Sequence, residues 1–149
     1  MPRKSLKDIP TYKLEKVLDK WFSYFIRLRD SDNEGFIKCC TCGRRKWWKE
    51  SDNGHYSKRD KAHRFNEKNC NAQCTYCNDK MKGQADRHAI HIDSLYGEGT
   101  ADYLRATENR PNKLMRHEYL YLIDEYKKKA KTEANKRGLR IEDPIPINL

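Results

Sequence analysis

The apolar residues near the start of the chain recur at intervals of three and four positions. Between residues 11 and 30 they are Leu14, Val17, Leu18, Trp21, Phe22, Phe25 and Ile26. This period matches one face of an α-helix, and polar residues occupy the opposite face. Pro10 and the turn-forming residues 30–35 mark the two ends. We therefore expect a helix over 11–30 that packs into a core or against a partner helix.

Weaker patterns predict the remaining elements. Helices are expected over residues 78–95 (with a break near Gly83), 100–108 and 111–137. Pro111 opens the last of these, because proline fits the first turn of a helix. Short strands are expected over 36–39, 52–58 and 64–73, the last two paired with each other. The final residues, 141–149, contain two prolines and are expected to be extended.

The composition limits how large the core can be. Apolar and charged residues each make up 36% of the 149 residues, against a usual ~45–50% apolar and ~25% charged. No run approaches the ~20 apolar residues of a membrane span, and the N-terminus has no apolar signal segment. We expect a cytoplasmic protein without a membrane partner. Its six cysteines then favour metal binding over disulfides.

The charge is strongly positive and unevenly distributed. Lys and Arg number 32 against 22 acidic residues, a net charge of +10, which makes a polyanion a candidate partner. Residues 44–68 hold nine basic and four acidic residues, and 127–140 hold seven basic residues and Glu133 alone. A charge run is often only a solvated face. The interpretation as a solvated face is stronger for residues 127–140 than for residues 44–68, because the latter lie between the two cysteine pairs.

Four cysteines form two Cys-x2-Cys pairs. They are Cys39 with Cys42 and Cys74 with Cys77, with 31 residues between the pairs. Two such turns can complete a tetrahedron of thiolates, the arrangement of a closed structural zinc site. A redox role is the competing interpretation, but the βαβ pattern of a thioredoxin-like motif is missing. Cys40 and Cys70 are left outside the predicted set.

His55, Asn69 and Asn78 follow the cysteines in a set order. The stretch Asn69–Gly83, NCNAQCTYCNDKMKG, resembles the zinc-bearing HNH endonucleases, in which N-x4-C-x2-C is followed by His or Asn and then K-x-G. The strings GFIKCCTCGRRK, DNGHY, RFNEKN and QCTYCN, between residues 35 and 86, resemble the NinG/Rap family of lambdoid phages more closely. Phage endonuclease VII is similar at a greater distance. The resemblance implies a ββα-metal fold and cleavage of branched recombination DNA.

Phosphodiester cleavage needs a base, a cation on the phosphate and a stabilised leaving oxygen. His55 is the candidate base, because imidazole titrates near neutral pH. The carboxylate of Asp52 and the amide oxygen of Asn78 suit a catalytic Mg²⁺ or Mn²⁺. The resemblance implies that Asn69 holds the loop beside His55. Candidate phosphate contacts are Arg44, Arg45, Lys58, Arg59, Arg64, Lys80 and Lys82.

Two features of this region leave more than one interpretation open. Many HNH proteins place a metal ligand directly before the base, but Gly54 occupies that position here. On a strand, Asp52 would point to the same side as position 54, because side chains alternate. It could reach the metal directly or through water. Trp47 and Trp48 could stack on unpaired bases or pack against the zinc turn.

Together these features predict an α+β metal-dependent endonuclease with a zinc-stapled ββα-metal core. Residues 1–34 would form an N-terminal helical extension, 35–97 the nuclease core, and 98–149 a C-terminal helical region with a basic tail. The resemblance implies that the substrates are D-loops and Holliday junctions in the bacterial host of a phage or prophage, and that cleavage leaves 3′-hydroxyl and 5′-phosphate ends. Two opposed cuts suit a twofold dimer, with helices 11–30 and 111–137 as candidate surfaces.

Three other functions stay open at this stage. A non-catalytic zinc-finger DNA-binding protein needs the cysteines and the charge, but not His55. A recombination accessory factor would use its long helix to dock on a partner. An HNH nuclease without branch preference, such as a homing or restriction enzyme, would keep the whole site and cut ordinary duplex.

Overall fold

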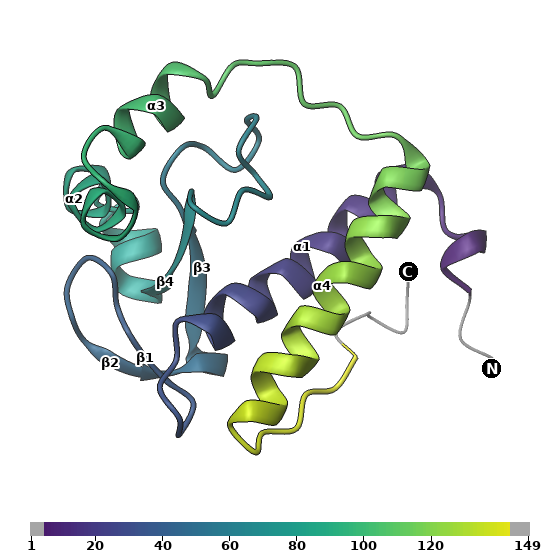
Figure 1. Cartoon of the computed structure of the whole chain (residues 1–149), viewed down its shortest axis with the longest axis horizontal. Helices are drawn as coiled ribbons and strands as arrows, with labels where there is room; N and C mark the ends of the chain where they lie inside the picture. Colours follow the sequence, from purple (N-terminus) through teal and green to yellow (C-terminus); the bar gives the residue numbers. More distant parts are fainter. Residues whose placement is uncertain (1–4, 144–149) are drawn as a thin grey trace.

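Two long helices from opposite ends of the chain lie side by side in the computed structural model (Figure 1), which describes residues 5–143. They are α1 (Thr11–Arg29) and α4 (Arg116–Lys136). The predicted apolar face of α1 is buried as expected, and Phe22 meets the ring of Tyr126 edge-on at 4.8 Å. Each such side chain contributes roughly 1.5–3 kcal/mol by burial. The partner helix of the prediction therefore comes from the same chain, and this face is not free for a dimer.

The start of α4 corrects the prediction that Pro111 opens a long helix. Residues 111–115 are extended and cross from one part of the molecule to the other, before α4 begins at Arg116 (Figure 1). The carboxylate of Glu118 accepts the backbone N–H of Met115 at 2.6 Å, which caps the helix there. Arg116 donates to the carbonyl oxygens of Leu6, Lys7 and Ile9. Capping and this contact with the N-terminal segment fix the start, rather than the proline.

Two small antiparallel sheets lie between the long helices in sequence. Strands β1 (Phe36–Lys38) and β2 (Arg45–Trp47) form the first, and β3 (Ser51–His55) and β4 (Cys70–Cys74) form the second. The predicted pairing of the second and third strands is confirmed with shorter strands. The sequence did not indicate β2, because its residues are mostly exposed and show no apolar alternation.

Short helices follow the second sheet. The single turn η3 (Tyr76–Lys80) leads into α2 (Ala85–Tyr96) and α3 (Thr100–Ala106), with 3-10 turns η1 (Leu6–Asp8) and η2 (Trp48–Glu50) elsewhere. The predicted break near Gly83 is confirmed, since Gly83 has a φ of 85°. Helices α2 and α3 pack on each other through a small cluster around Ile92 and Leu104.

The coarse prediction of an α+β fold is thus confirmed. The domain boundaries after residues 34 and 97 stay predictions. Residues 141–143 lie outside helices and strands, whereas 144–149 of the predicted extended segment lie outside the described residues. Across residues 5–143, every helix is too short or too polar to cross a membrane.

Candidate metal centre and adjoining cleft

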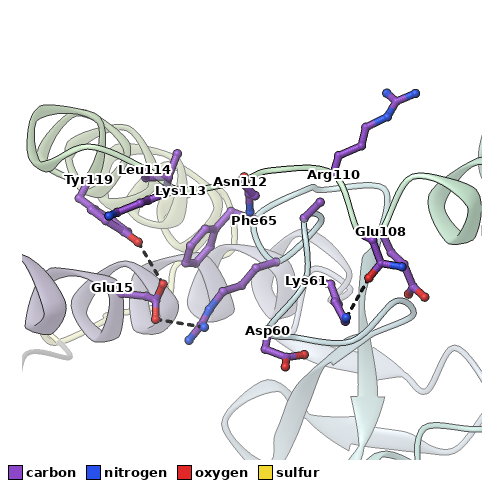
Figure 2. A pocket seen from close by; sticks show the side chains of 13 residues that line it. Glu15, Asp60, Lys61, Phe65, Glu108, Arg110, Asn112, Lys113, Leu114 and Tyr119 are labelled. Carbon is purple, nitrogen blue, oxygen red and sulfur yellow. Dashed lines mark hydrogen bonds and ion pairs between the residues drawn. The ribbon is translucent and has the colours of Figure 1, made fainter.

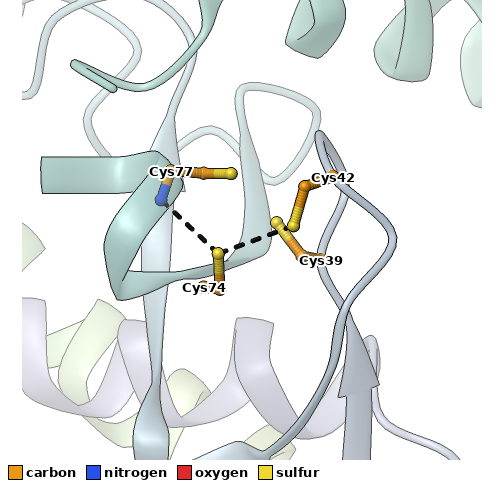
Figure 3. A group of neighbouring side chains, drawn as sticks. All are labelled: Cys39, Cys42, Cys74 and Cys77. Atoms are coloured by element: carbon orange, nitrogen blue, oxygen red, sulfur yellow. Dashed lines mark hydrogen bonds between the residues drawn. The ribbon is translucent and has the colours of Figure 1, made fainter. Parts of the chain in front are cut away.

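The four predicted zinc ligands gather at one point (Figure 3). Cys39 and Cys42 lie in the turn between β1 and β2, Cys74 ends β4, and Cys77 lies in η3. Their sulfur atoms are all within 4.8 Å of one another, and Sγ of Cys42 is 3.7 Å from Sγ of Cys74. The cluster therefore joins the two sheets through their side chains.

Local hydrogen bonds explain why the first cysteine turn has this shape. The N–H of Cys39 donates to the carbonyl of Arg44 at 2.8 Å, and the N–H of Gly43 donates back to Cys39 at 2.9 Å. Gly43 has a φ of 77°, a conformation that glycine adopts without steric cost. In the second turn, the N–H of Cys77 points to the sulfur of Cys74 at 3.4 Å.

The cluster fits a zinc ion. Two sulfurs on a tetrahedron of ~2.3 Å bonds lie about 3.8 Å apart, close to the observed Cys42–Cys74 distance. Burial raises the pKa of the Cys39 thiol, but hydrogen bonds from Thr41 and from backbone amides lower it by more. The net effect is a pKa of about 6. A metal ion binds the thiolate form of cysteine, so these hydrogen bonds act in the same direction as a bound cation would. Cys40 and Cys70 are outside the cluster, and burial raises the pKa of both thiols.

A cleft of about 780 Å³ lies beside this centre, between α1 and the second sheet. Its predicted residues are Asp52 and His55 from β3, Asn78 from η3, Arg59 and Lys82. Helix α1 supplies the other wall, and five cations line the cleft against two carboxylates. The cations are Lys20, Arg27, Lys49, Arg59 and Lys82. The balance of charge suits an anionic ligand.

His55 is held in one tautomer by the backbone. Its Nε2 lies 2.9 Å from the carbonyl oxygen of Arg64. A carbonyl only accepts, so Nε2 carries the proton and Nδ1 of the neutral ring keeps its lone pair. Burial is the main factor that lowers the pKa of His55 below its ordinary value. The ring is therefore neutral near pH 7, with one nitrogen able to take a proton.

The loop 56–69 that follows β3 is closed by Asn69. The Oδ1 of this buried side chain accepts the N–H of Ser57 at 2.8 Å, and its Nδ2 donates to the carbonyls of Ser57 and His63 at 3.2 Å each. Asn69 is absent from the lining of the cleft. Asn69 therefore bonds to both ends of the segment 57–63, in the loop that also carries the Arg64 carbonyl contacted by His55.

Asp52 and Asn78 contact each other directly. The Nδ2 of Asn78 donates to Oδ2 of Asp52 at 3.0 Å, and Thr75 donates to Oδ1 at 3.3 Å. An ionised carboxylate only accepts, so the amide oxygen of Asn78 is left for another partner. Carboxylate and amide oxygens are the ligands that Mg²⁺ and Mn²⁺ prefer. Asp52 and Asn78 thus bring oxygen donors of this kind to the cleft.

Gly54 leaves no room for a metal-binding side chain. A Cβ at this position would lie 2.4 Å from Oε1 of Gln73 on the paired strand. Gln73 is fully buried, and its Nε2 donates to Thr41 and to the carbonyl of Gly83, both at 2.9 Å. The neighbouring strand thus occupies the place of the usual ligand, and Asp52 is the carboxylate that β3 contributes to the cleft.

Some predicted phosphate contacts have carboxylate partners in this structure. Arg59 and Arg64 both pair with Asp19 of α1, and Arg64 also pairs with Glu15 at 3.1 Å. Arg45 pairs with Asp32 and Glu34. The remaining four are exposed: Arg44, Lys58, Lys80 and Lys82. Of the full set, Arg59 and Lys82 line the cleft.

The two tryptophans differ in their surroundings. Trp48 is fully buried in a cluster that includes Cys39, Cys74 and Cys77, so it packs against the cysteine centre. Trp47 is half-buried, with its ring 5.3 Å from that of Phe36. Of the two roles considered for Trp48, stacking on unpaired bases or packing against the cysteine turn, the structure therefore shows the packing role.

The sequence reasoning missed the contribution of α1 to the cleft. Asp19, Ser23 and Arg27 are spaced four residues apart and all line it. This spacing places them on one side of a helix. In the sequence, the recurrence of polar residues at i, i+4 and i+8 beside the apolar face was the signal that could have indicated that this side of the helix lines a cleft.

A second cavity, of about 350 Å³, lies beneath the extended segment before α4 (Figure 2). Glu15 accepts from the hydroxyl of Tyr119 at 3.0 Å, and Lys61 donates to Asn109 at 2.8 Å. Burial and the Glu15 carboxylate raise the pKa of Tyr119 to about 12. These bonds join α1 to α4 and the loop to the segment before α4, whereas the buried Oε2 of Glu108 has no partner among the described residues.

The fold and site together define a small α+β protein in which a four-cysteine cluster adjoins a cationic cleft. The chain belongs to the Bacteriophage Lambda NinG protein family, whose model matches residues 3–136. The protein ninG of Escherichia phage lambda is 31% identical over 119 residues, which cover 76% of this chain and 54% of that protein. The chain thus spans about half the length of this curated relative. No solved structure matches the chain significantly.

Proposed function

We propose that this chain is a metal-dependent DNA endonuclease that cuts branched recombination intermediates such as D-loops and Holliday junctions. The observation that carries the proposal is the meeting of three groups in one cationic cleft. His55 faces it as a neutral imidazole, and Asp52 and Asn78 line it as a bonded pair of oxygen donors. Base, cation site and phosphate-attracting charge are the requirements for phosphodiester hydrolysis.

Each residue has a role that follows from its contacts. Nδ1 of His55 takes the proton of the attacking water, while the Arg64 carbonyl stabilises the imidazolium that forms. Asp52 and Asn78 would hold Mg²⁺ or Mn²⁺, which supplies charge neutralisation at the phosphate and the leaving 3′-oxygen. Asn69 keeps the loop in place. The products are 3′-hydroxyl and 5′-phosphate ends.

The order of elements supports a ββα-metal core. Strands β3 and β4 are antiparallel and are followed at once by the turn η3, which carries Asn78. His55 ends the first strand, and Cys74 and Cys77 tie the second strand and the turn to the cysteine centre. Zinc would stabilise this arrangement without taking part in the chemistry.

The preference for branched DNA rests on the resemblance over residues 35–86, a segment that lies inside the part of the chain matched by the NinG family model. A four-way junction needs two opposed cuts, which suits a homodimer with twofold symmetry. Because the apolar face of α1 is buried against α4, such a dimer would form through other surfaces.

The test compares a labelled immobile four-way junction with the matched linear duplex, with and without Mg²⁺. Wild type should cut the junction only when Mg²⁺ is present. His55→Ala should bind the junction but not cut it, whereas His117→Ala, on the exposed side of α4, should cut normally. Binding without cutting under any divalent cation would replace the proposal with a non-catalytic zinc module. Equal cutting of both DNAs would indicate a nuclease without branch preference.

A further inference from the structure

Arg27 of α1 is a half-buried cation whose ionic partner is missing from the described residues. Within residues 5–143, its guanidinium makes no ion pair with a carboxylate. Arg29, two residues further along the same helix, pairs with Asp30 at 2.7 Å. Burial lowers the pKa of Arg27, which shows the cost of keeping this charge out of water. A nearby anion would offset that cost.

The guanidinium is fixed in place by groups at the base of the cleft. Its Nε donates to the hydroxyl of Ser23 at 3.1 Å, and its Nη1 donates to the carbonyls of Trp48 and Ser51 at 3.1 and 3.3 Å. The rings of Tyr24 and Trp48 lie about 5 Å from the guanidinium carbon, at 5.3 and 5.4 Å. The side chain is therefore held before any ligand arrives.

One edge of the guanidinium is left open. Its Nη2 makes no hydrogen bond to any described residue. This atom is also not buried, so it is accessible to a ligand. Arg27 lines the same cleft as Asp52 and His55. Asp52 is close enough for its negative charge to raise the pKa of Arg27 against the effect of burial. The unbonded N–H groups thus belong to a side chain that lines the cleft and lies near Asp52.

We infer that Arg27 is a phosphate-binding residue, whose Nη2 donates to a non-bridging oxygen of the DNA phosphate held beside His55. The inference rests on the proposed function and adds to it a wall of the active site that comes from the N-terminal helix. A planar guanidinium fixed by four acceptors, two on Ser23 and the carbonyls of Trp48 and Ser51, presents its remaining N–H groups in one direction, as a phosphate requires. It also adds positive charge where the transition state gains negative charge.

The test separates phosphate binding from a merely structural role. Binding of the junction is measured at increasing salt without divalent metal, and cleavage is measured with Mg²⁺. Loss of one phosphate contact should reduce the slope of log K against log salt by about 0.9. For Arg27→Gln we expect that reduction together with a loss of roughly 100-fold in kcat/KM.

Arg29→Gln is the matched control. Arg29 also donates to backbone carbonyls, those of Glu67 and Cys70, but it does not line the cleft. The Arg29→Gln substitution should lower the melting temperature of the protein and leave the slope of log K against log salt at the wild-type value. If Arg27→Gln also lowers the melting temperature but keeps the wild-type slope, Arg27 is structural and the inference is wrong.

Arg27→Lys carries the test even where the Gln variant does not fold. Lysine keeps the charge but has no planar fork, so the salt slope should be preserved while kcat falls at least about tenfold. Wild-type kcat and KM in this variant would overturn the inference and leave the proposed function standing. A wild-type protein that neither binds nor cuts the junction would overturn both.

Discussion

The carboxylate of Asp19 on α1 pairs with the guanidinium of Arg64, and the backbone carbonyl of that same Arg64 accepts the proton of His55 Nε2. A residue of the N-terminal helix thus orients the candidate base through one intermediate residue. Glu15 and Arg59 join the same network. The helix that builds the core therefore also fixes the cleft.

Asp19→Asn should destabilise the protein and impair the cleft together. The side chains of Asp19 and Arg64 are only 12% and 17% exposed, so their charge-assisted bonds are poorly replaced by water. We expect a loss of about 1–3 kcal/mol in the free energy of unfolding by urea. Asp124→Asn, which removes an exposed pair with Lys128, should change little. An equal, small effect of both variants would show that the buried pair is not important.

Removal of one cluster cysteine should remove the metal. Wild type should contain about one zinc ion per chain by elemental analysis. Cys74→Ser should lose it and melt at a markedly lower temperature, because a structural metal contributes directly to folding. Cys40→Ser should keep both, since Cys40 lies outside the cluster. Zinc retained in the Cys74 variant, or lost in the Cys40 variant, would contradict the assignment of ligands.

Acid should destabilise the protein through His88. This side chain is fully buried, and burial lowers its pKa to about 4 from an unfolded value of 6.5. The folded state then binds fewer protons than the unfolded state between these values. Stability is therefore complete above pH 6.5 and falls as the pH drops towards 4, by up to about 3 kcal/mol at ~1.36 kcal/mol per unit.

The measurement is urea unfolding between pH 7 and 4 for wild type and His88→Gln. The Gln variant should show a shallower fall, because Nε2 of His88 accepts from Asn71 and its buried Nδ1 has no partner among the described residues to hold an added charge. His117→Gln, on the surface of α4, should follow wild type. Parallel curves for all three proteins would assign the acid effect to other groups.

Gly54→Ala should destabilise the second sheet by about 1–3 kcal/mol, the usual cost of overpacking. The added Cβ would meet Oε1 of Gln73, which its own hydrogen bonds hold in place. In the double variant with Gln73→Ala, the shortest contact of the added methyl group is removed, and its contacts at 3.1 Å with the Asn71 carbonyl and with Cβ of residue 73 remain. In a double-mutant cycle, the stability lost by the double variant should therefore be smaller than the sum of the losses of the two single variants, by at least about 0.5 kcal/mol. Additive losses would show that no such clash exists.

The features that the sequence predicted well are those set by short-range chemistry. The period of α1 identified its buried face, and the spacing of Cys39, Cys42, Cys74 and Cys77 identified a cluster that the structure brings together. In both cases the residue types themselves demand the arrangement. A stripe of large apolar side chains must be buried, and paired thiols favour a shared ion.

The features that the sequence did not predict depend on distant partners. The start of α4 depends on Glu118 and on contacts of Arg116 with the N-terminal segment. The part of α1 in the cleft depends on Trp48 and Ser51, whose carbonyls hold Arg27. No local pattern encodes a contact between a polar helix residue and a backbone carbonyl more than twenty positions away.

The packing of α1 on α4 has a consequence for synthesis in the cell. The first residue of α4 follows the last residue of α1 by 87 positions, so the helices cannot meet until the ribosome has made both. At roughly 5–20 residues per second, this interval lasts about 4–17 seconds. Until then the face of α1 lacks the cover that α4 provides, such as the contact between Phe22 and Tyr126. The core between α1 and α4 can therefore be completed only late in synthesis, after most of the chain has left the ribosome.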